Sequence, residues 1–272
     1  MNGAGLERSQ YIIRGGVAGR ERLRVLARVA RPATLQLLER AGIRPGMICL
    51  DAGCGGGDVS FDLARLVGPT GKVVGIDMDE IKLDIARNEA AQQQLENIEF
   101  RHCDICTTEL QEQFDLVHAR FLLSHLPNPS ATVAKLGSAL RPGGMLVTAD
   151  TDFRDFFCEP PCPAVSRFVE LYTETIQLRG GNANLGPRLP QLLKENGFHN
   201  AQMNVVQQAN TDDVRLMVPL TMESISEAVL AEGLATRQEI EQVVAELYEF
   251  IRTPGSVLSG PRVVEAWGSI DA

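Results

Sequence analysis

The sequence predicts an α/β protein in which a mostly parallel sheet is covered by helices on both faces. Three observations support this class. Short, continuously apolar strands alternate with helical segments between residues 46 and 150. A glycine-dense turn, 53–57, follows the first of these strands directly, and acidic residues stand where successive strands end. Apolar strands joined by helices are typical of parallel sheets that are buried on both faces.

The expected elements follow one another along the whole chain. Strands are expected at residues 47–50, 72–76, 98–102, 115–118, 145–149, 198–207 and 263–267. Helices are expected at residues 20–42, 58–66, 80–95, 130–140, 186–196, 224–232 and 236–251. In the first helix the apolar residues recur with a helical period, and Pro32 sits between the two halves of this pattern. Gly42 and the Pro45-Gly46 pair then end it.

Length and charge limit the class of protein and its partners. The chain of 272 residues suits one α/β domain with an appended lid, or two small domains. The net charge of −9 argues against a large nucleic-acid interface. Six arginines near the N-terminus are expected to form the solvated face of an amphipathic helix: Arg14, Arg20, Arg22, Arg24, Arg28 and Arg31.

The lack of a recognisable targeting signal and the pattern of cysteines predict a cytoplasmic protein. No secretory signal and no apolar stretch of about 20 residues is recognisable, so neither export nor membrane insertion is expected. The six cysteines are scattered, which suits free thiols better than disulfides. Cys103 and Cys106 resemble half of a zinc site, but no second pair completes it, and we expect no metal.

The glycine turn predicts a site for a small ligand. Glycines let the backbone approach a ligand closely, and the following helix directs its free N–H groups at that ligand. A dinucleotide fingerprint would need a further glycine at position 58 or 60, and these positions hold Asp58 and Ser60. An acid at 58 would repel a pyrophosphate but tolerate a cationic sulfonium. A Walker loop is also absent from the sequence.

The acids at the strand ends predict how a nucleoside would be bound. Asp77 ends the second strand, where a carboxylate accepts hydrogen bonds from ribose hydroxyls. Met78 would pack on an adenine face. Asp104 would accept from the adenine amino group, while the N–H of Ile105 donates to the ring. For each acid the alternative is a helix cap or a turn residue.

These motifs together resemble the class I, Rossmann-like S-adenosylmethionine-dependent methyltransferases. The resemblance rests on residues 49–57, 74–79, 104–105, 114–127 and 140–146, in the order in which that family carries its motifs. The flanks resemble a bacterial small-molecule branch more loosely. The resemblance implies a mostly parallel, seven-stranded sheet and S-adenosylmethionine as the cofactor. The implied cofactor-binding residues are Tyr11, Asp51, Gly53, Cys54, Gly55, Asp77, Met78, Asp104, Ile105, Ala119 and Arg120.

The resemblance also implies a division of the chain. Residues 1–45 would form a helical cap over the cofactor, and residues 46–152 the cofactor-binding core. Residues 153–185 would form a lid that contacts the acceptor, and residues 186–272 the rest of the core with a helical insert at 212–252. The lid is rich in phenylalanine and proline, which predicts a small apolar or aromatic acceptor.

The expected chemistry is methyl transfer to a small molecule, on oxygen, nitrogen or carbon. The protein would contribute mainly proximity and alignment, and a base is needed only where the acceptor must lose a proton. His125 and Asp152 are the candidate bases, with His118 and Asp150 as further titratable groups near the same edge. For both histidines and acids, packing or capping is the alternative.

Other functions remain open at this stage. An enzyme of the same fold could bind S-adenosylmethionine and catalyse another reaction, such as a cyclisation. A non-catalytic sensor of the cofactor is a second alternative. A nicotinamide oxidoreductase is opposed by Asp58 and Ser60, and an arsenic methyltransferase by Ala119, which replaces the reactive cysteine. A homodimer is left open.

Overall fold

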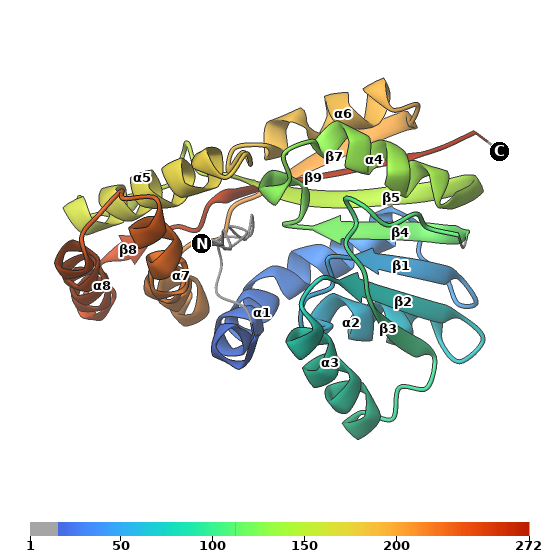
Figure 1. Cartoon of the computed structure of the whole chain (residues 1–272), viewed down its shortest axis with the longest axis horizontal. Helices are drawn as coiled ribbons and strands as arrows, with labels where there is room; N and C mark the ends of the chain where they lie inside the picture. The colour runs from blue at the N-terminus through green and yellow to red at the C-terminus, as the bar shows by residue number, and fades with distance from the viewer. Residues whose placement is uncertain (1–15, 112, 272) are drawn as a thin grey trace, which may run out of the picture.

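A seven-stranded sheet with helices on both faces forms the centre of the molecule (Figure 1). The computed structural model describes residues 16–111 and 113–271. The strands lie in the order β3-β2-β1-β4-β5-β9-β7, with β9 antiparallel to both of its neighbours and the pairs among β1 to β5 parallel. Their bounds are β1 Ile48–Ala52, β2 Lys72–Asp77, β3 Ile98–His102, β4 Phe114–Arg120, β5 Leu140–Asp152, β7 His199–Val206 and β9 Arg262–Ser269. The α/β, mostly parallel seven-stranded prediction is confirmed.

Two groups of helices cover the sheet. One face carries α1 Gly16–Arg40, α2 Asp58–Val67 and α3 Glu80–Gln92; the other carries α4 Pro129–Ser138 and α6 Leu189–Glu195. A short 3-10 turn precedes each of these two helices: η1 Leu123–His125 lies before α4, and η2 Gly186–Arg188 lies before α6. Alternate residues of each inner strand face opposite helix layers, so both faces must be apolar: Leu50 packs on the α4 and α6 side, and Cys49 on the α1 and α2 side.

A third group of helices lies beyond the sheet. It consists of α5 Pro163–Leu178, α7 Asp212–Ala231 and α8 Arg237–Arg252, with a small ladder between β6 Cys158–Glu159 and β8 Val257–Leu258. Figure 1 shows this group at the left, separated from most of the sheet. Fully buried side chains such as Leu171, Met222 and Leu247 join the three helices in one apolar cluster.

Two helices are longer than the sequence predicts. The helix expected at 224–232 begins at Asp212, where the side chain of Thr211 caps it by accepting from the N–H of Val214 at 3.2 Å. The helix expected at 20–42 begins at Gly16 and continues through Pro32 to Arg40. Tertiary packing on both sides outweighs the local cost of a proline inside a helix.

Arginine side chains fix α1 to its neighbours. Arg20 is buried and pairs with Asp58 at 2.7 Å and Glu89 at 2.6 Å. Arg28 makes a bidentate pair with Asp213, at the start of α7. The expectation of a solvated arginine face is therefore wrong for Arg20 and Arg22, which are buried, whereas the side chains of Arg24, Arg28 and Arg31 are more than half exposed. Arg14 lies outside the described residues.

No helix in the described part of the chain is both long and apolar enough to cross a membrane.

Candidate active site

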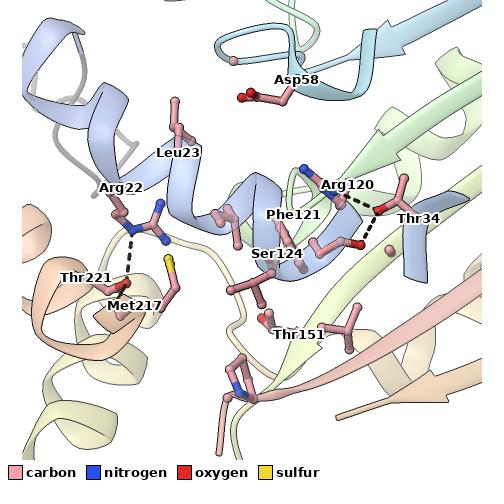
Figure 2. Close-up of a pocket in the computed structure, with 18 of the residues that line it drawn as sticks. Arg22, Leu23, Thr34, Asp58, Arg120, Phe121, Ser124, Thr151, Met217 and Thr221 are labelled. Carbon is pink, nitrogen blue, oxygen red and sulfur yellow. Dashed lines mark hydrogen bonds between the residues drawn. The ribbon is translucent and has the colours of Figure 1, made fainter. Parts of the chain in front are cut away.

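A cavity lies at the carboxyl edge of the sheet, between α1, the glycine turn, the strand ends and α7 (Figure 2). In open α/β sheets this edge is where ligands bind. On α1 the lining side chains recur at helical spacing, at Leu23, Leu26, Ala30 and Thr34. The leucines stay half-exposed because they face the cavity and not a packed core.

The glycine turn forms one wall, and its shape depends on close approach. A Cβ on Gly56 would lie 2.4 Å from Nη1 of Arg20, so the guanidinium rests on bare backbone there. Gly57 caps α2 in the left-handed region, with φ at 82°. The N–H of Gly55 donates to Oδ2 of Asp77 at 2.9 Å, which ties the turn to the end of β2. The turn is therefore held as a shallow cradle beside a fixed carboxylate.

A buried polar network forms the cavity floor. Asp51 accepts a hydrogen bond from the hydroxyl of Ser60 at 2.5 Å and lies 2.8 Å from Nδ1 of His118. All three side chains are buried, and the carboxylate of Asp51 assigns the proton of that bond to Nδ1 of His118. The network holds the carboxylate of Asp51 in one orientation at the end of β1.

Arg120 is a second fixed charge at the site. Its Nη1 donates to the hydroxyl of Thr34 at 2.8 Å, a contact visible in Figure 2. Burial lowers the pKa of Arg120, and the negative charges of Asp51, Asp58 and Asp62 act against that lowering. The guanidinium also lies 5.5 Å from the ring centroid of Phe121, which adopts a positive φ of 54°.

His125 lines the cavity from the 3-10 turn η1. Burial, followed by the positive charges of Arg22 and Lys82, lowers the pKa of His125 to about 3. The imidazole is therefore neutral at physiological pH, and it is a weak base. Behind the turn, Asp150 accepts from the N–H groups of Leu123 and Ser124 at 3.1 and 3.3 Å, and burial raises its pKa to about 7.

The structure does not bring Asp152 to the cavity. Its carboxylate is buried and held by Arg154 at 2.7 Å and Arg262 at 2.6 Å. Burial acts to raise the pKa of Asp152, but the bonds from Arg154 and Arg262 outweigh it and hold the pKa below its ordinary value. Asp152 therefore anchors the end of β5 and does not line the cavity.

The predicted cofactor residues divide into two groups. Those that line the cavity are Asp51, Gly53, Cys54, Gly55, Asp77 and Arg120. Those outside its lining are Met78, Asp104, Ile105 and Ala119. Tyr11 lies outside the described residues.

Each residue of the second group has surroundings that keep it out of the cavity lining. Met78 is 59% exposed on the surface next to Asp77. Asp104 accepts from the N–H of Cys106 at 2.8 Å and from Thr107, so it acts as a turn residue in this structure. Ile105 and Ala119 are buried in the core between the sheet and α4. Roles for these residues toward an adenine ring or a methionyl group remain predictions.

Sequence reasoning missed several charged residues of the cavity. Arg22, Lys82 and Glu265 are all at least nine-tenths buried and line it. Glu265 carried a readable signal, because a carboxylate inside the apolar strand 263–267 is unusual unless it is partnered. It accepts from Nδ2 of Asn204 at 2.8 Å, and burial raises its pKa. No local sequence pattern indicates that Arg22 lines the cavity, because its partner Thr221 lies 199 positions away in the sequence.

The far wall of the cavity is aromatic. Phe153, Phe156, Phe168 and Tyr172 all line it. The rings of Phe153 and Tyr172 are 4.5 Å apart between centroids, and those of Phe156 and Phe168 are 6.1 Å apart. These tilted and edge-to-face ring pairs form an apolar surface that suits a flat or apolar ligand.

No group of three or more histidine, cysteine, aspartate or glutamate side chains within residues 16–111 and 113–271 is arranged to hold a metal ion. All six cysteines are free, and Cys54 lies at the cavity, where burial and the nearby Asp51 and Asp77 raise the pKa of its thiol.

Comparisons with known proteins identify the family of this chain. Residues 43–213 match the family model described as a methyltransferase domain. Demethylmenaquinone methyltransferases from strains of Staphylococcus aureus are 31% identical over 138 residues, which is 50% of this chain and 54% of theirs. The chain thus spans about half the length of the curated relatives that it matches.

Solved structures with low sequence identity share the fold. A protein from Bacillus halodurans assigned as a methyltransferase gives a TM-score of 0.61 at 19% identity, covering 88% of this chain and 98% of its own. Phosphoethanolamine N-methyltransferase 2 from Haemonchus contortus, solved with S-adenosyl-L-methionine, gives a TM-score of 0.58 at 17% identity. The match covers 88% of this chain and 52% of that one. The [4+2]-cyclase SpnF gives a TM-score of 0.54 at 18% identity, and the match covers 89% of this chain and 82% of that one.

The family match covers more than half of the chain, and it includes the glycine turn, the acids at the strand ends and the cavity floor. The predicted resemblance is thereby confirmed: the chain belongs to the methyltransferase-domain family, the class I enzymes that depend on S-adenosylmethionine.

Proposed function

We propose that this protein transfers the methyl group of S-adenosylmethionine to a small apolar or aromatic molecule. One observation carries the proposal: a single cavity joins a charged wall, made by the glycine turn and the strand ends, to an aromatic wall. A charged cofactor and an apolar acceptor would each meet a matching surface, with their reacting groups in the same space.

The charged wall suits the cofactor. The carboxylate of Asp77 is already oriented by the N–H groups of Gly55 and Asp79, and its free lone pairs suit ribose hydroxyls. Asp51 and Arg120 present opposite charges at the ends of β1 and β4, which suits the amino and carboxylate groups of a methionyl tail. The acids on this wall would also attract a positively charged sulfonium.

The aromatic wall suits the acceptor. Phe153 and Tyr172 belong to residues 153–185, which we propose act as a lid together with the helical insert 212–252, while residues 1–45 act as a cap over the cofactor. The Staphylococcus aureus relatives are named for demethylmenaquinone, a quinone, which supports an acceptor with an apolar ring.

The titratable groups favour catalysis by positioning. A histidine with a pKa of about 3 is too weak a base to remove a proton from an ordinary phenol or ammonium group. Asp152 is held by two arginines away from the cavity. We therefore propose that His125 acts as a neutral hydrogen-bond partner and that the acceptor reaches the site with its nucleophilic lone pair available.

Calorimetric titration with S-adenosylmethionine and S-adenosylhomocysteine tests the cofactor, with NAD and NADP as controls. We expect binding in the micromolar range for the adenosyl compounds alone. The Asp77→Ala variant should weaken it at least about tenfold, because hydrogen bonds to a charged group are lost. Asp84→Ala, an exposed carboxylate on the outer side of α3, is the matched control and should bind normally. Tighter binding of a nicotinamide would refute the proposal.

The mass of the product separates methyl transfer from other chemistry on this fold, such as cyclisation. Candidate quinols and aromatic compounds incubated with the protein and S-adenosylmethionine should gain the mass of one methylene group. S-adenosylhomocysteine should form in equal amount. A product of unchanged mass, or no consumption of the cofactor, would favour the alternative reactions.

A further inference from the structure

Arg22 is a buried cation in the cavity wall. The residue is 7% exposed and comes from α1. Its Nε donates to Oγ1 of Thr221 on α7 at 3.1 Å, and Figure 2 shows the side chain reaching across to Thr221 and Met217. Across residues 16–111 and 113–271, no ion pair joins Arg22 to a carboxylate. A buried guanidinium with a single neutral partner is costly unless something else supplies negative charge.

The acids of the cavity already have other partners. These partners are Ser60 and His118 for Asp51, Arg20 for Asp58, the N–H groups of Gly55 and Asp79 for Asp77, and Asn204 for Glu265. None of these acids is hydrogen-bonded to Arg22 in the described part of the chain. The protein therefore leaves this charge available to a ligand.

Arg20, two residues before Arg22 in α1, has different partners. Arg20 is also buried, at 4% exposure, but it has two carboxylate partners, Asp58 at 2.7 Å and Glu89 at 2.6 Å. Arg20 thus holds α1 to α2 and α3 through two carboxylates. Arg22 lacks them and faces the cavity, which separates it from the structural arginines of the same helix.

The surroundings of Arg22 are positive and apolar. Arg22, Lys82 and His125 all line the cavity, and the positive charges of Arg22 and Lys82 contribute to the lowered pKa of His125. On the α7 side, Met217 and Val218 line the same cavity, and Val218 packs in one cluster with Phe168 and the other lid side chains. A ligand placed here would meet a cation at one end and apolar side chains around its body.

We propose that Arg22 binds a carboxylate of the acceptor, carried on an aromatic or apolar body. This inference rests on the proposed function and adds that the methyl acceptor is an organic acid. The carboxylate of the cofactor has its own cation in Arg120, at the end of β4, so the two arginines would separate cofactor from acceptor.

Titration of the protein saturated with S-adenosylhomocysteine tests the inference. The probes are benzoate and 2-naphthoate, each compared with its amide, which has the same shape without the charge. We expect each acid to bind at least about tenfold more tightly than its amide, as a charged hydrogen bond requires. Arg22→Met should remove the difference, and Arg22→Lys should keep part of it.

Two controls separate this role from a structural one. Arg24→Met removes an exposed arginine of the same helix, paired with Glu89, and should leave the preference unchanged. Arg22→Met should raise the thermal stability of the ligand-free protein, because an uncompensated buried charge is replaced by an apolar side chain of similar length. Thr221 keeps a partner in that variant, since its hydroxyl donates to the carbonyl of Met217 at 2.6 Å.

The cofactor itself is the competing ligand for Arg22. If Arg22→Met weakens S-adenosylhomocysteine but not 5′-methylthioadenosine, which lacks the carboxylate, then Arg22 serves the cofactor and the inference fails. It also fails if acids and amides bind equally, if neither binds, or if the preference survives in Arg22→Met. Should S-adenosylhomocysteine not bind at all, the proposed function fails, and the acid and amide titrations of the ligand-free protein still decide the inference.

Discussion

Buried charges define the candidate site at the scale of single residues. Asp51 is held by hydrogen bonds from Ser60 and His118, and Arg120 donates a hydrogen bond to Thr34. The hydroxyl groups of Ser60 and Thr34 hold these two charges in position without cancelling them, so the charges stay available to a ligand. Asp150 differs, because it supports the turn that carries His125 from outside the cavity lining.

Asp150 makes a testable contribution to stability. Its pKa rises from an ordinary 3.8 to about 7 in the folded protein, so the folded chain holds this proton where the unfolded chain has lost it. Stability from this group is full below about pH 4 and is lost as pH rises toward 7. Relative to Asp150→Asn, the wild type should therefore lose roughly 2–3 kcal/mol of unfolding free energy between pH 5 and pH 8.

Urea unfolding of both proteins at several pH values measures this difference. Asparagine keeps an oxygen that can accept from Leu123 and Ser124, so the variant should fold. Parallel pH profiles for the two proteins would show that Asp150 is not protonated near neutral pH.

At the scale of elements, the turn between β1 and α2 depends on glycine backbone geometry. Gly57 has a φ of 82°, and a Cβ there would lie 2.9 Å from the ring of Phe100 and 3.0 Å from that of Phe61. Both rings belong to the apolar cluster between α2, α3 and β3. The turn thus connects the wall of the cavity to the packing of two helices.

Gly57→Ala should cost more stability than a left-handed glycine alone explains. Gly42, at the end of α1, has a φ of 79° and no atom within 4 Å of a Cβ, so Gly42→Ala measures backbone strain by itself. We expect about 1 kcal/mol for Gly42→Ala and a further 1–3 kcal/mol, roughly, for Gly57→Ala through overpacking. Urea unfolding measures both, and equal losses would contradict the steric argument.

At the scale of the whole molecule, the cavity is enclosed by parts of the chain that are distant in sequence. The helix α1 forms one side, and Arg28 joins it to α7 through Asp213. The sheet forms the floor, and the third helix group supplies the aromatic wall. A ligand in this cavity therefore contacts all three parts, and its binding should stabilise the molecule as a unit.

Thermal unfolding tests this coupling. At 100 times its dissociation constant, S-adenosylhomocysteine should add about 2.7 kcal/mol to the unfolding free energy, which raises Tm by roughly 5–10 °C in a chain of this size. At the same concentration Asp77→Ala should show a much smaller rise. A rise of equal size in both proteins, or with NAD, would indicate binding elsewhere.

The sequence by itself determined the architecture and one wall of the site. Alternating apolar strands and helices predicted the parallel sheet, and the spacing of glycines and acids from Asp51 to Asp77 predicted the charged wall. These features are local, because a strand, its turn and the next helix are continuous in the chain. The position of each acid at a strand end also follows from strand length alone.

Only the tertiary structure decided which other side chains join that wall. Asp152 is paired with Arg262 from β9 and does not line the cavity. Arg22 bonds to Thr221 at the cavity, and Glu265 lines the same cavity. Such contacts join residues more than a hundred positions apart, and no local pattern records them. Burial, which sets the pKa values of His125 and Asp150, is likewise a property of the packed molecule and is absent from any single segment.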